Sequence, residues 1–265
     1  MANLKELHRQ KRGQVSAPEV KQYENSSLTE LSALLKHDDP RKRTIAARLI
    51  GAHRKIELIP LLCKSLAMEK SLYARIALSE ALGKMGEPAV IPLLALLGKI
   101  GNNQETELPQ KYCAKKSFPL ARDMAARTLV KLGEPAISGL METMRGGNHF
   151  RTQQALDAIG GIVSRTHDMR SLSVLLGAFK DCADNEVTIW KIVRALSAFQ
   201  HVEALGPLIE MLKNHAEPSI RWEAARSIGH VGISTPEVIR ALQNGLQDQN
   251  SEVRKAAKIS LERIK

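Results

Sequence analysis

Two tryptophans, each followed four residues later by an arginine, are the residues of this sequence best suited to hold another molecule. The pairs are Trp190/Arg194 and Trp222/Arg226. Residues four apart on a helix are neighbours, and a guanidinium can stack there on an indole ring. Since tryptophan and arginine dominate many protein interfaces, two such pairs favour a binding patch. Alternatively, each tryptophan covers the ridge between two helices, with the arginine stem packed over it.

The helices that carry these pairs belong to an internal repeat. The phrase GEPAVIPLL at 86–94 recurs as GEPAISGLM at 133–141. The glycine is expected to end one helix, the glutamate to cap the next, and the proline to lie in its first turn. Each second helix carries a phrase related to Arg-x-x-Ala-Ala-x-x-Leu-Gly, and positions are counted here from the last residue of that phrase, the anchor. The anchors are Gly51, Gly83, Val130, Gly160, Ser197, Gly229 and Glu262.

The spacing of the anchors predicts the fold. Successive anchors are 32, 47, 30, 37, 32 and 33 residues apart. A period near 32 residues with one long gap predicts an all-α solenoid of about seven helix pairs, with one inserted loop at 101–118. The solenoid is expected to span residues 26–265, and residues 1–25 to form a basic tail or a short extra helix.

Composition restricts the classes of function. The 39 Lys and Arg outnumber the 28 Asp and Glu, giving a net charge of +11. This excess suits nucleic acid, an anionic membrane surface or an acidic protein, and it is also compatible with a solvated basic surface. The three widely spaced cysteines, Cys63, Cys113 and Cys182, indicate reduced thiols in a cytoplasmic protein. The sequence contains no stretch of 18 apolar residues, so we expect no membrane-spanning helix.

The repeat phrases resemble HEAT repeats, above all the variety first associated with phycobilisome lyases. The Ile-Pro-Leu-Leu of the first helices, at 59–62 and 91–94, shares this resemblance. The resemblance implies a right-handed superhelix whose second helices line the concave face. It also implies an internal ladder of arginines that pair with acids or carbonyls between neighbouring repeats. Position −8 lies on the same helical face as the apolar positions −5, −4 and −1, and we assign it to this ladder: Arg43, Arg75, Arg122, Arg221 and Arg254.

Position −3 is expected to point away from the core, because it lies about 140° from position −8 on the helix. Together with position +1 it predicts a mostly basic concave groove, in which Asp157 and Glu80 are the acids. We expect Trp190, Arg194, Trp222 and Arg226 to anchor a partner, which places the binding surface in the C-terminal half. The residues expected to add longer-range attraction are Arg48, Arg127, Lys84 and Lys131.

The function expected from these features is non-catalytic: a scaffold that holds an acidic segment of a partner protein. Nucleic-acid binding along the same groove is the alternative. HEAT-like alkylpurine DNA glycosylases are a further resemblance, since Asp157, Arg194, Trp190 and Trp222 supply similar residue types, although Gln153 stands where an aromatic residue is expected. HEAT-like deoxyhypusine hydroxylases hold two irons with repeated His-Glu dipeptides, and this sequence contains none. We therefore expect no catalytic residues, no metal site and no cofactor.

Overall fold

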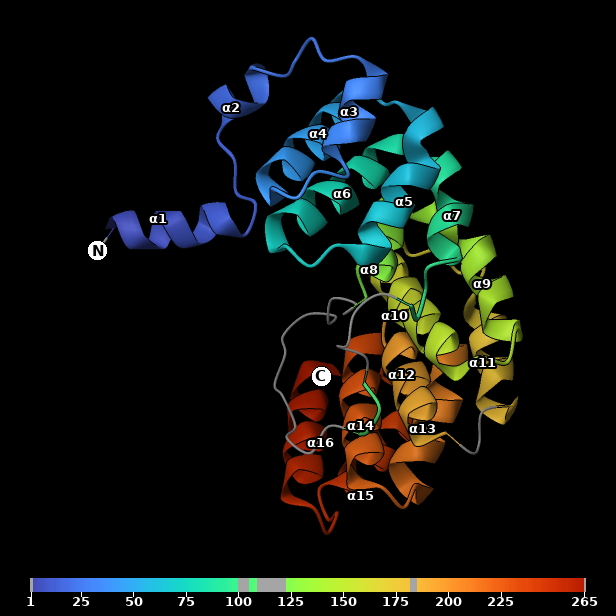
Figure 1. Cartoon of the computed structure of the whole chain (residues 1–265). Coiled ribbons are helices and arrows are strands. Elements are labelled where there is room, and N and C mark those ends of the chain that lie inside the picture. Colours follow the sequence, from blue (N-terminus) through green and yellow to red (C-terminus); the bar gives the residue numbers. More distant parts are fainter. Residues whose placement is uncertain (1, 100–104, 109–122, 182–184, 265) are drawn as a thin grey trace. The chain divides into compact units, whose positions relative to one another are not determined.

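The structure is a computed structural model that describes residues 2–99, 105–108, 123–181 and 185–264. Within these residues all regular secondary structure is helical (Figure 1). Contacts divide the chain into two compact units. Unit 1 comprises residues 1–102 and 122–136, and unit 2 comprises residues 103–121 and 137–265.

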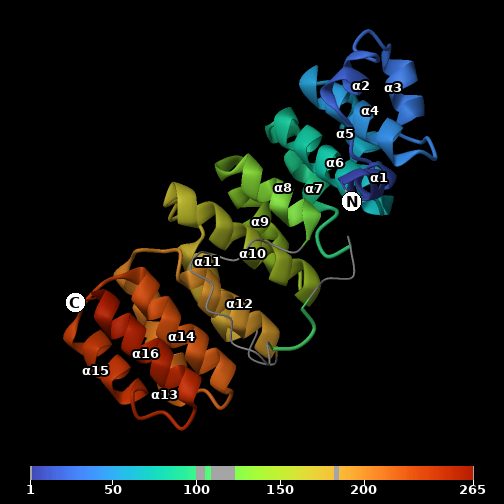
Figure 2. The ribbon, with the colours of Figure 1, turned by 90° about the vertical axis from the view of Figure 1, so that its left-hand side faces the viewer.

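Unit 1 begins with two helices that precede the repeats, α1 (Ala2–Lys11) and α2 (Ala17–Lys21). The backbone just after α1 is tied to the repeats, since the amide of Tyr73 donates to the carbonyl of Arg12 at 3.0 Å. Three helix pairs follow, and their second helices α4, α6 and α8 contact one another in succession (Figure 2). The pairs are α3 (Leu28–Leu34) with α4 (Pro40–Ala52), α5 (Ile59–Met68) with α6 (Leu72–Met85), and α7 (Val90–Leu94) with α8 (Met124–Leu132).

Unit 2 contains four further helix pairs, and its second helices α10, α12, α14 and α16 also contact one another in succession. The pairs are α9 (Ile137–Arg145) with α10 (His149–Thr166), α11 (Leu172–Asp181) with α12 (Glu186–Leu196), α13 (Leu205–Asn214) with α14 (Pro218–Val231), and α15 (Pro236–Gly245) with α16 (Ser251–Ile264). Each second helix contains an anchor or ends directly before one. The predicted α-solenoid of seven helix pairs is therefore confirmed for the residues that the structure describes.

The Gly-Glu-Pro phrase separates one repeat from the next. Gly86 and Gly133 have φ angles of 73° and 77°, which favour glycine, and they end α6 and α8. A short 3₁₀ turn follows each of them, η2 (Glu87–Ala89) and η3 (Glu134–Ala136), with the proline in its first turn. The expectation that the glutamate caps the next helix is wrong for Glu87, because Gly86 is the N-cap and Glu87 lies inside the turn.

Two anchor glycines mark places where neighbouring second helices come closest. A Cβ at Gly51 would lie 2.7 Å from the Cα of Ala81, and one at Gly229 would lie 2.4 Å from the Oγ of Ser260. A larger residue at either position would force the helices apart. Beside these contacts the predicted inward positions are buried, as Ala46 and Ile50 show with 0% exposure. Small residues therefore lie where these second helices pack closely, within a core made mainly of Leu, Ile, Val and Ala.

Candidate functional site

Two arginines at position −8, Arg43 and Arg221, join neighbouring repeats. Arg43 donates from Nε and Nη2 to both carboxylate oxygens of Glu69, at 2.7 and 2.9 Å, and from Nη1 to the carbonyls of His37 and Asp38. Arg221 in unit 2 repeats the pattern with both oxygens of Asp248, at 2.7 and 3.0 Å, and with two carbonyls of its own repeat. Such bidentate pairs fix both distance and orientation.

The ladder follows a positional rule that our sequence analysis missed. Each bidentate acid stands at position −14 of the repeat after the arginine, and the carbonyls belong to positions −14 and −13 of the arginine's own repeat. Among the described residues, Arg75 and Arg254 bond only such carbonyls, those of Glu69, Asp248 and Gln249. Arg122 lies outside the described residues. An acid 14 residues before the next anchor, which follows Arg43 and Arg221 but not Arg75, was the available signal.

Glu69 and Asp248 are the acids paired with the ladder arginines. Burial alone would raise the pKa of each carboxyl, but the paired arginine and nearby backbone amides together have a larger, opposite effect. Burial is the largest single influence on Glu69, yet the Arg43 guanidinium and the amides of Ser71 and Lys70 hold the Glu69 pKa below its usual value. The pKa of Asp248 is lowered in the same way by Arg221 and the Asn250 amide. Both acids therefore stay ionised, and both are occupied by contacts inside the protein.

Of the four residues expected to anchor a partner in unit 2, three are buried and Arg226 is half-buried. Trp190 and Arg194 are each 5% exposed and Trp222 is 8% exposed, while the Arg226 side chain is 15% exposed. Our expectation that these four residues line an open groove is therefore wrong. The predicted pairs do form, since the guanidinium carbons of Arg194 and Arg226 lie 4.2 and 5.7 Å from the ring centres of Trp190 and Trp222. They stack inside the protein, which is the alternative that the sequence left open.

A charged cluster surrounds these stacked pairs, and it consists of Glu105, Asp157, Lys191, Arg194, Glu223 and Arg226. Asp157 on α10 accepts from Lys191 Nζ at 2.8 Å and from the Arg194 guanidinium, so both its oxygens are used. Glu223 on α14 accepts from Trp190 Nε1 and from Arg226, each at 3.1 Å. The cluster therefore joins three successive second helices.

The two buried acids of the charged cluster respond differently to burial. Burial alone would raise both pKa values. For Asp157 the charges of Arg194 and Lys191 outweigh it and hold the pKa below its usual value. For Glu223 burial outweighs the help from Arg194, Arg226 and Trp190, so the Glu223 pKa is raised. The difference follows from geometry, because Asp157 has two close cations and Glu223 has one.

The surroundings of α12 explain why the sequence-based expectation failed. Every residue from Val187 to Leu196 is buried, so this helix has no solvent-facing side. Glu105 belongs to the inserted loop at 101–118. It lies 3.0 Å from Lys191 Nζ and 4.0 Å from the Arg194 guanidinium. Of the insertion at 101–118 only 105–108 are described. Glu105 of the chain itself thus lies beside Arg194, which we expected to face a partner.

The corresponding residues of unit 1 are exposed. Arg48 on α4, Lys84 on α6, and Arg127 and Lys131 on α8 all face solvent, and we call these four the unit 1 basic face. Glu80 on α6 is the exposed acid among them. A Cβ at Gly83 would lie 3.9 Å from Cδ of Lys131, so the Lys131 side chain reaches across to α6. The Arg48 guanidinium contacts the Val15 carbonyl at 3.4 Å.

The combination of residue types that resembled a glycosylase site comes together in part. Arg194 bonds Asp157 and stacks on Trp190, whereas Trp222 stacks on Arg226 instead. Gln153 donates to Asn185 and Thr188 on the neighbouring repeat, at 3.3 and 3.2 Å. Because Asp157 is 4% exposed and ion-paired through both oxygens, it is not presented to a groove.

The described residues contain no group of three or more His, Cys, Asp or Glu side chains that could hold a metal ion. Among the same residues, no helix combines the length and the apolar character that crossing a membrane requires.

Comparison with known proteins places the chain in a family. A profile of HEAT repeats matches residues 28–99 and 172–262, more than half of the chain. A designed armadillo repeat protein is similar, with 18% identity, a TM-score of 0.44, and coverage of 90% of this chain and 100% of that one. Human deoxyhypusine hydroxylase in complex with glycerol shows 16% identity and a TM-score of 0.41, over 97% of this chain and 94% of that one. No curated protein matches the sequence. The match to the family profile shows that the chain belongs to the HEAT repeat proteins.

Proposed function

We propose that this HEAT repeat protein is a non-catalytic scaffold that binds an acidic segment of a partner protein on the unit 1 basic face. The observation that carries the proposal is the exposure of Arg48, Lys84, Arg127 and Lys131 on consecutive second helices. The cations at position −3 of unit 2, Arg194 and Arg226, are largely buried and paired inside the protein. Unit 1 therefore offers most of the predicted charges that an outside molecule can reach, beside the exposed Arg263 of unit 2.

The unit 1 basic face combines charge with an apolar contact. Ile76 on α6 is 37% exposed and stands at position −7, one helical turn before Glu80. An extended acidic segment could place carboxylates against the cations and an apolar side chain against Ile76. Exposed charges mainly steer encounter and set the partner's sign, while an apolar contact adds affinity that salt does not screen. Glu80 favours a segment whose carboxylates are spaced rather than continuous.

The test is binding of a fluorescent peptide with spaced glutamates and one leucine, followed by anisotropy at low salt. The variant Lys84→Glu/Lys131→Glu should lose most of the affinity, because two attractions become repulsions. The matched control is Lys213→Glu/Lys258→Glu, which makes the same change of charge on exposed lysines of unit 2. Equal losses in the two variants would show that only net charge matters and would overturn the assignment to unit 1.

Nucleic acid is the competing ligand, and the same assay separates it. Single-stranded DNA, duplex DNA and RNA of equal charge should bind more weakly than the peptide. Several phosphate contacts would instead give tighter binding whose logarithm falls steeply with that of the salt concentration. That result, with loss of binding in Lys84→Glu/Lys131→Glu, would replace the acidic protein segment by nucleic acid.

A further inference from the structure

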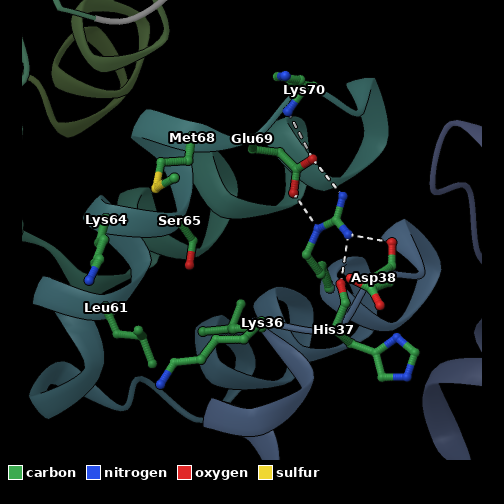
Figure 3. Close-up of a pocket in the computed structure, with 11 residues that line it drawn as sticks. Lys36, His37, Asp38, Leu61, Lys64, Ser65, Met68, Glu69 and Lys70 are labelled. Carbon is green, nitrogen blue, oxygen red and sulfur yellow. Dashed lines mark hydrogen bonds and ion pairs between the residues drawn. The ribbon is translucent and has the colours of Figure 1, made fainter.

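A pocket of about 460 Å³ lies in unit 1 where repeats one and two meet, beside the ion pair of Arg43 and Glu69 (Figure 3). Its walls come from the end of α3 with the following residues, and from α5. Lys36 belongs to the first wall, and Leu61, Lys64, Ser65 and Met68 belong to the second. None of these residues takes part in the proposed binding by the unit 1 basic face.

The groups around this pocket divide into satisfied and available ones. Arg43 is fully used by Glu69 and by two carbonyls, so it serves the ladder. By contrast, no hydrogen bond or ion pair joins the Lys36 ammonium, the Lys64 ammonium or the Ser65 hydroxyl to another described residue. In Figure 3 the Lys36 and Lys64 side chains extend to the same side of the pocket, with Leu61 between them.

The available groups define the chemistry of a ligand. Lysine ammonium groups only donate hydrogen bonds, and a serine hydroxyl can donate as well. Three donors on three residues match the three terminal oxygens of a phosphate better than the two oxygens of a carboxylate. A phosphomonoester also carries nearly two negative charges at neutral pH, which suits two lysines. Leu61 and the 73% exposed Met68 give apolar surface beside the lysines, on which a short stem can lie.

The chain contains an internal comparison for this pocket. A pocket of about 490 Å³ lies at the equivalent place in repeats six and seven, beside the ion pair of Arg221 and Asp248. Counted from the anchors, Asn214, Gln243 and Asn244 replace the two lysines and the serine, and Arg240 and Gln247 replace the apolar pair. The ladder therefore forms without these lysines, so its geometry does not explain their presence in repeats one and two.

We propose that the pocket between repeats one and two binds a phosphomonoester with a short apolar stem, such as a phosphoserine or phosphothreonine side chain. Lys36, Lys64 and Ser65 would donate to the phosphate oxygens, and Leu61 and Met68 would contact the stem. Two acids also line the pocket. Glu69 is neutralised by Arg43, and Asp38, on the side of the pocket away from the Lys36 ammonium, adds a repulsion that a ligand must overcome. Lys70, at the opposite edge of the pocket, offsets this repulsion.

The experiment measures binding of the peptide Ala-Ala-pThr-Ala-Ala to the full chain by titration calorimetry. One site per chain is expected, because neutral amide side chains take the places of Lys36, Lys64 and Ser65 in the pocket of repeats six and seven, and Lys213 is the one lysine among the residues that line it. Lys36→Gln/Lys64→Gln should weaken binding roughly tenfold or more, as expected when two charge-assisted hydrogen bonds are lost. The control Lys213→Gln/Lys258→Gln removes the same charge from exposed sites in unit 2 and should change affinity less than about twofold. All four lysines are exposed, and unchanged thermal unfolding would show that both variants fold.

Several outcomes would overturn the proposal. A peptide with glutamate in place of phosphothreonine that binds equally well would show that the pocket reads only a carboxylate. Inorganic phosphate that binds as tightly as the peptide would exclude a contribution from the stem. Oligothymidylate that binds more tightly than the peptide, and loses affinity in Lys36→Gln/Lys64→Gln, would reassign the lysines to nucleic acid. Undiminished peptide binding by that variant would remove the site altogether.

Discussion

Position −3 of the second helices is open to solvent throughout unit 1 and closed in repeats four and five of unit 2. Glu80 and Asp157 show the contrast most simply, because both are acids at this position. Glu80 is exposed on α6, whereas Asp157 is 4% exposed and ion-paired to Lys191 and Arg194. The helix pairs themselves are alike. The repeat pattern therefore determines the position of a residue on its helix, but not whether other residues cover its side chain.

The difference between the units has a local cause at position −6. Unit 1 has Ile45, Ala77 and Met124 there, whereas three consecutive repeats of unit 2 have Gln154, Lys191 and Glu223. Lys191 and Glu223 bond side chains of neighbouring helices and so draw the charges of position −3 inward. Polar residues at one additional repeat position can therefore pair with the charges of a repeat-protein surface and make them inaccessible to a partner.

The largest expected difference in stability is between substitutions of Trp190 in unit 2 and of Ile76, which stands at the same position in unit 1. Trp190→Ala should destabilise the protein by roughly 3–5 kcal/mol, since it leaves a cavity and removes the donor to Glu223. Ile76→Ala, at the same position −7 but 37% exposed, should cost about 1 kcal/mol. Urea unfolding monitored by circular dichroism gives both values. Similar small losses would mean that Trp190 is open to solvent after all.

The acids at position −3 give the next contrast. Asp157→Ala leaves Lys191 and Arg194 buried with one partner fewer, and it should cost about 3 kcal/mol or more. Glu80→Ala should stay within about 0.5 kcal/mol, as for most exposed positions. The comparison of the two units fails if urea midpoints shift equally in these variants.

The ladder should behave alike in both units, in contrast to position −3. Arg43→Ala and Arg221→Ala each remove the arginine that pairs with an acid and bonds two carbonyls, and each should cost about 2 kcal/mol. Arg75→Ala should cost less, since Arg75 bonds only one carbonyl among the described residues. Thermal unfolding of the three variants checks this order, and an effect confined to Arg221 would show that the two ladders differ in strength.

A pH effect of roughly 1 kcal/mol is expected from unit 2. Burial, followed by the charges of Arg263 and Arg226, lowers the pKa of His230 from 6.5 to about 4. Because the folded-state pKa is lowered, this stabilisation is present above pH 6.5 and is lost as the pH falls toward 4. Because His230 is only half-buried, solvent screening reduces this effect, and wild-type protein should lose roughly 1 kcal/mol from this residue between pH 7 and pH 5, whereas His230→Gln should not. Urea titrations at the two pH values test this, with the exposed His149→Gln as control.

Much of the fold could be predicted because it depends on local signals. Anchors recur in sequence, and a glycine such as Gly51 or Gly229 is required where two helices nearly touch. The arginines at −8 were assigned to the interior by their place on the apolar helical face. Their acid partners Glu69 and Asp248 were missed because each belongs to the following repeat and lies outside the Arg-x-x-Ala-Ala-x-x-Leu-Gly phrase.

The site could be predicted only where nothing else covers the helices. Helical angles correctly indicated that Arg48 and Lys84 face away from the core of unit 1, where both are exposed. The same angles failed for Arg194, because burial there depends on Lys191 from its own helix, Asp157 from the preceding repeat, and Glu105 from an insertion. A single-helix argument contains none of these long-range neighbours. The charged residues at −6 were the one sequence signal of internal pairing.

The pairing of position −8 with position −14 of the next repeat also gives the repeats a required order. Repeat seven carries Asp248 and needs an arginine before it, which repeat six supplies as Arg221. Repeat five has Ile189 at that position, and repeat six correspondingly begins with His215 instead of an acid. Deleting repeat six would place repeat five, with Ile189 at position −8, directly before repeat seven. The Asp248 carboxylate would then have no arginine to pair with. Repeats of this protein are therefore not interchangeable parts, and a shortened or permuted chain must keep each arginine directly ahead of its acid.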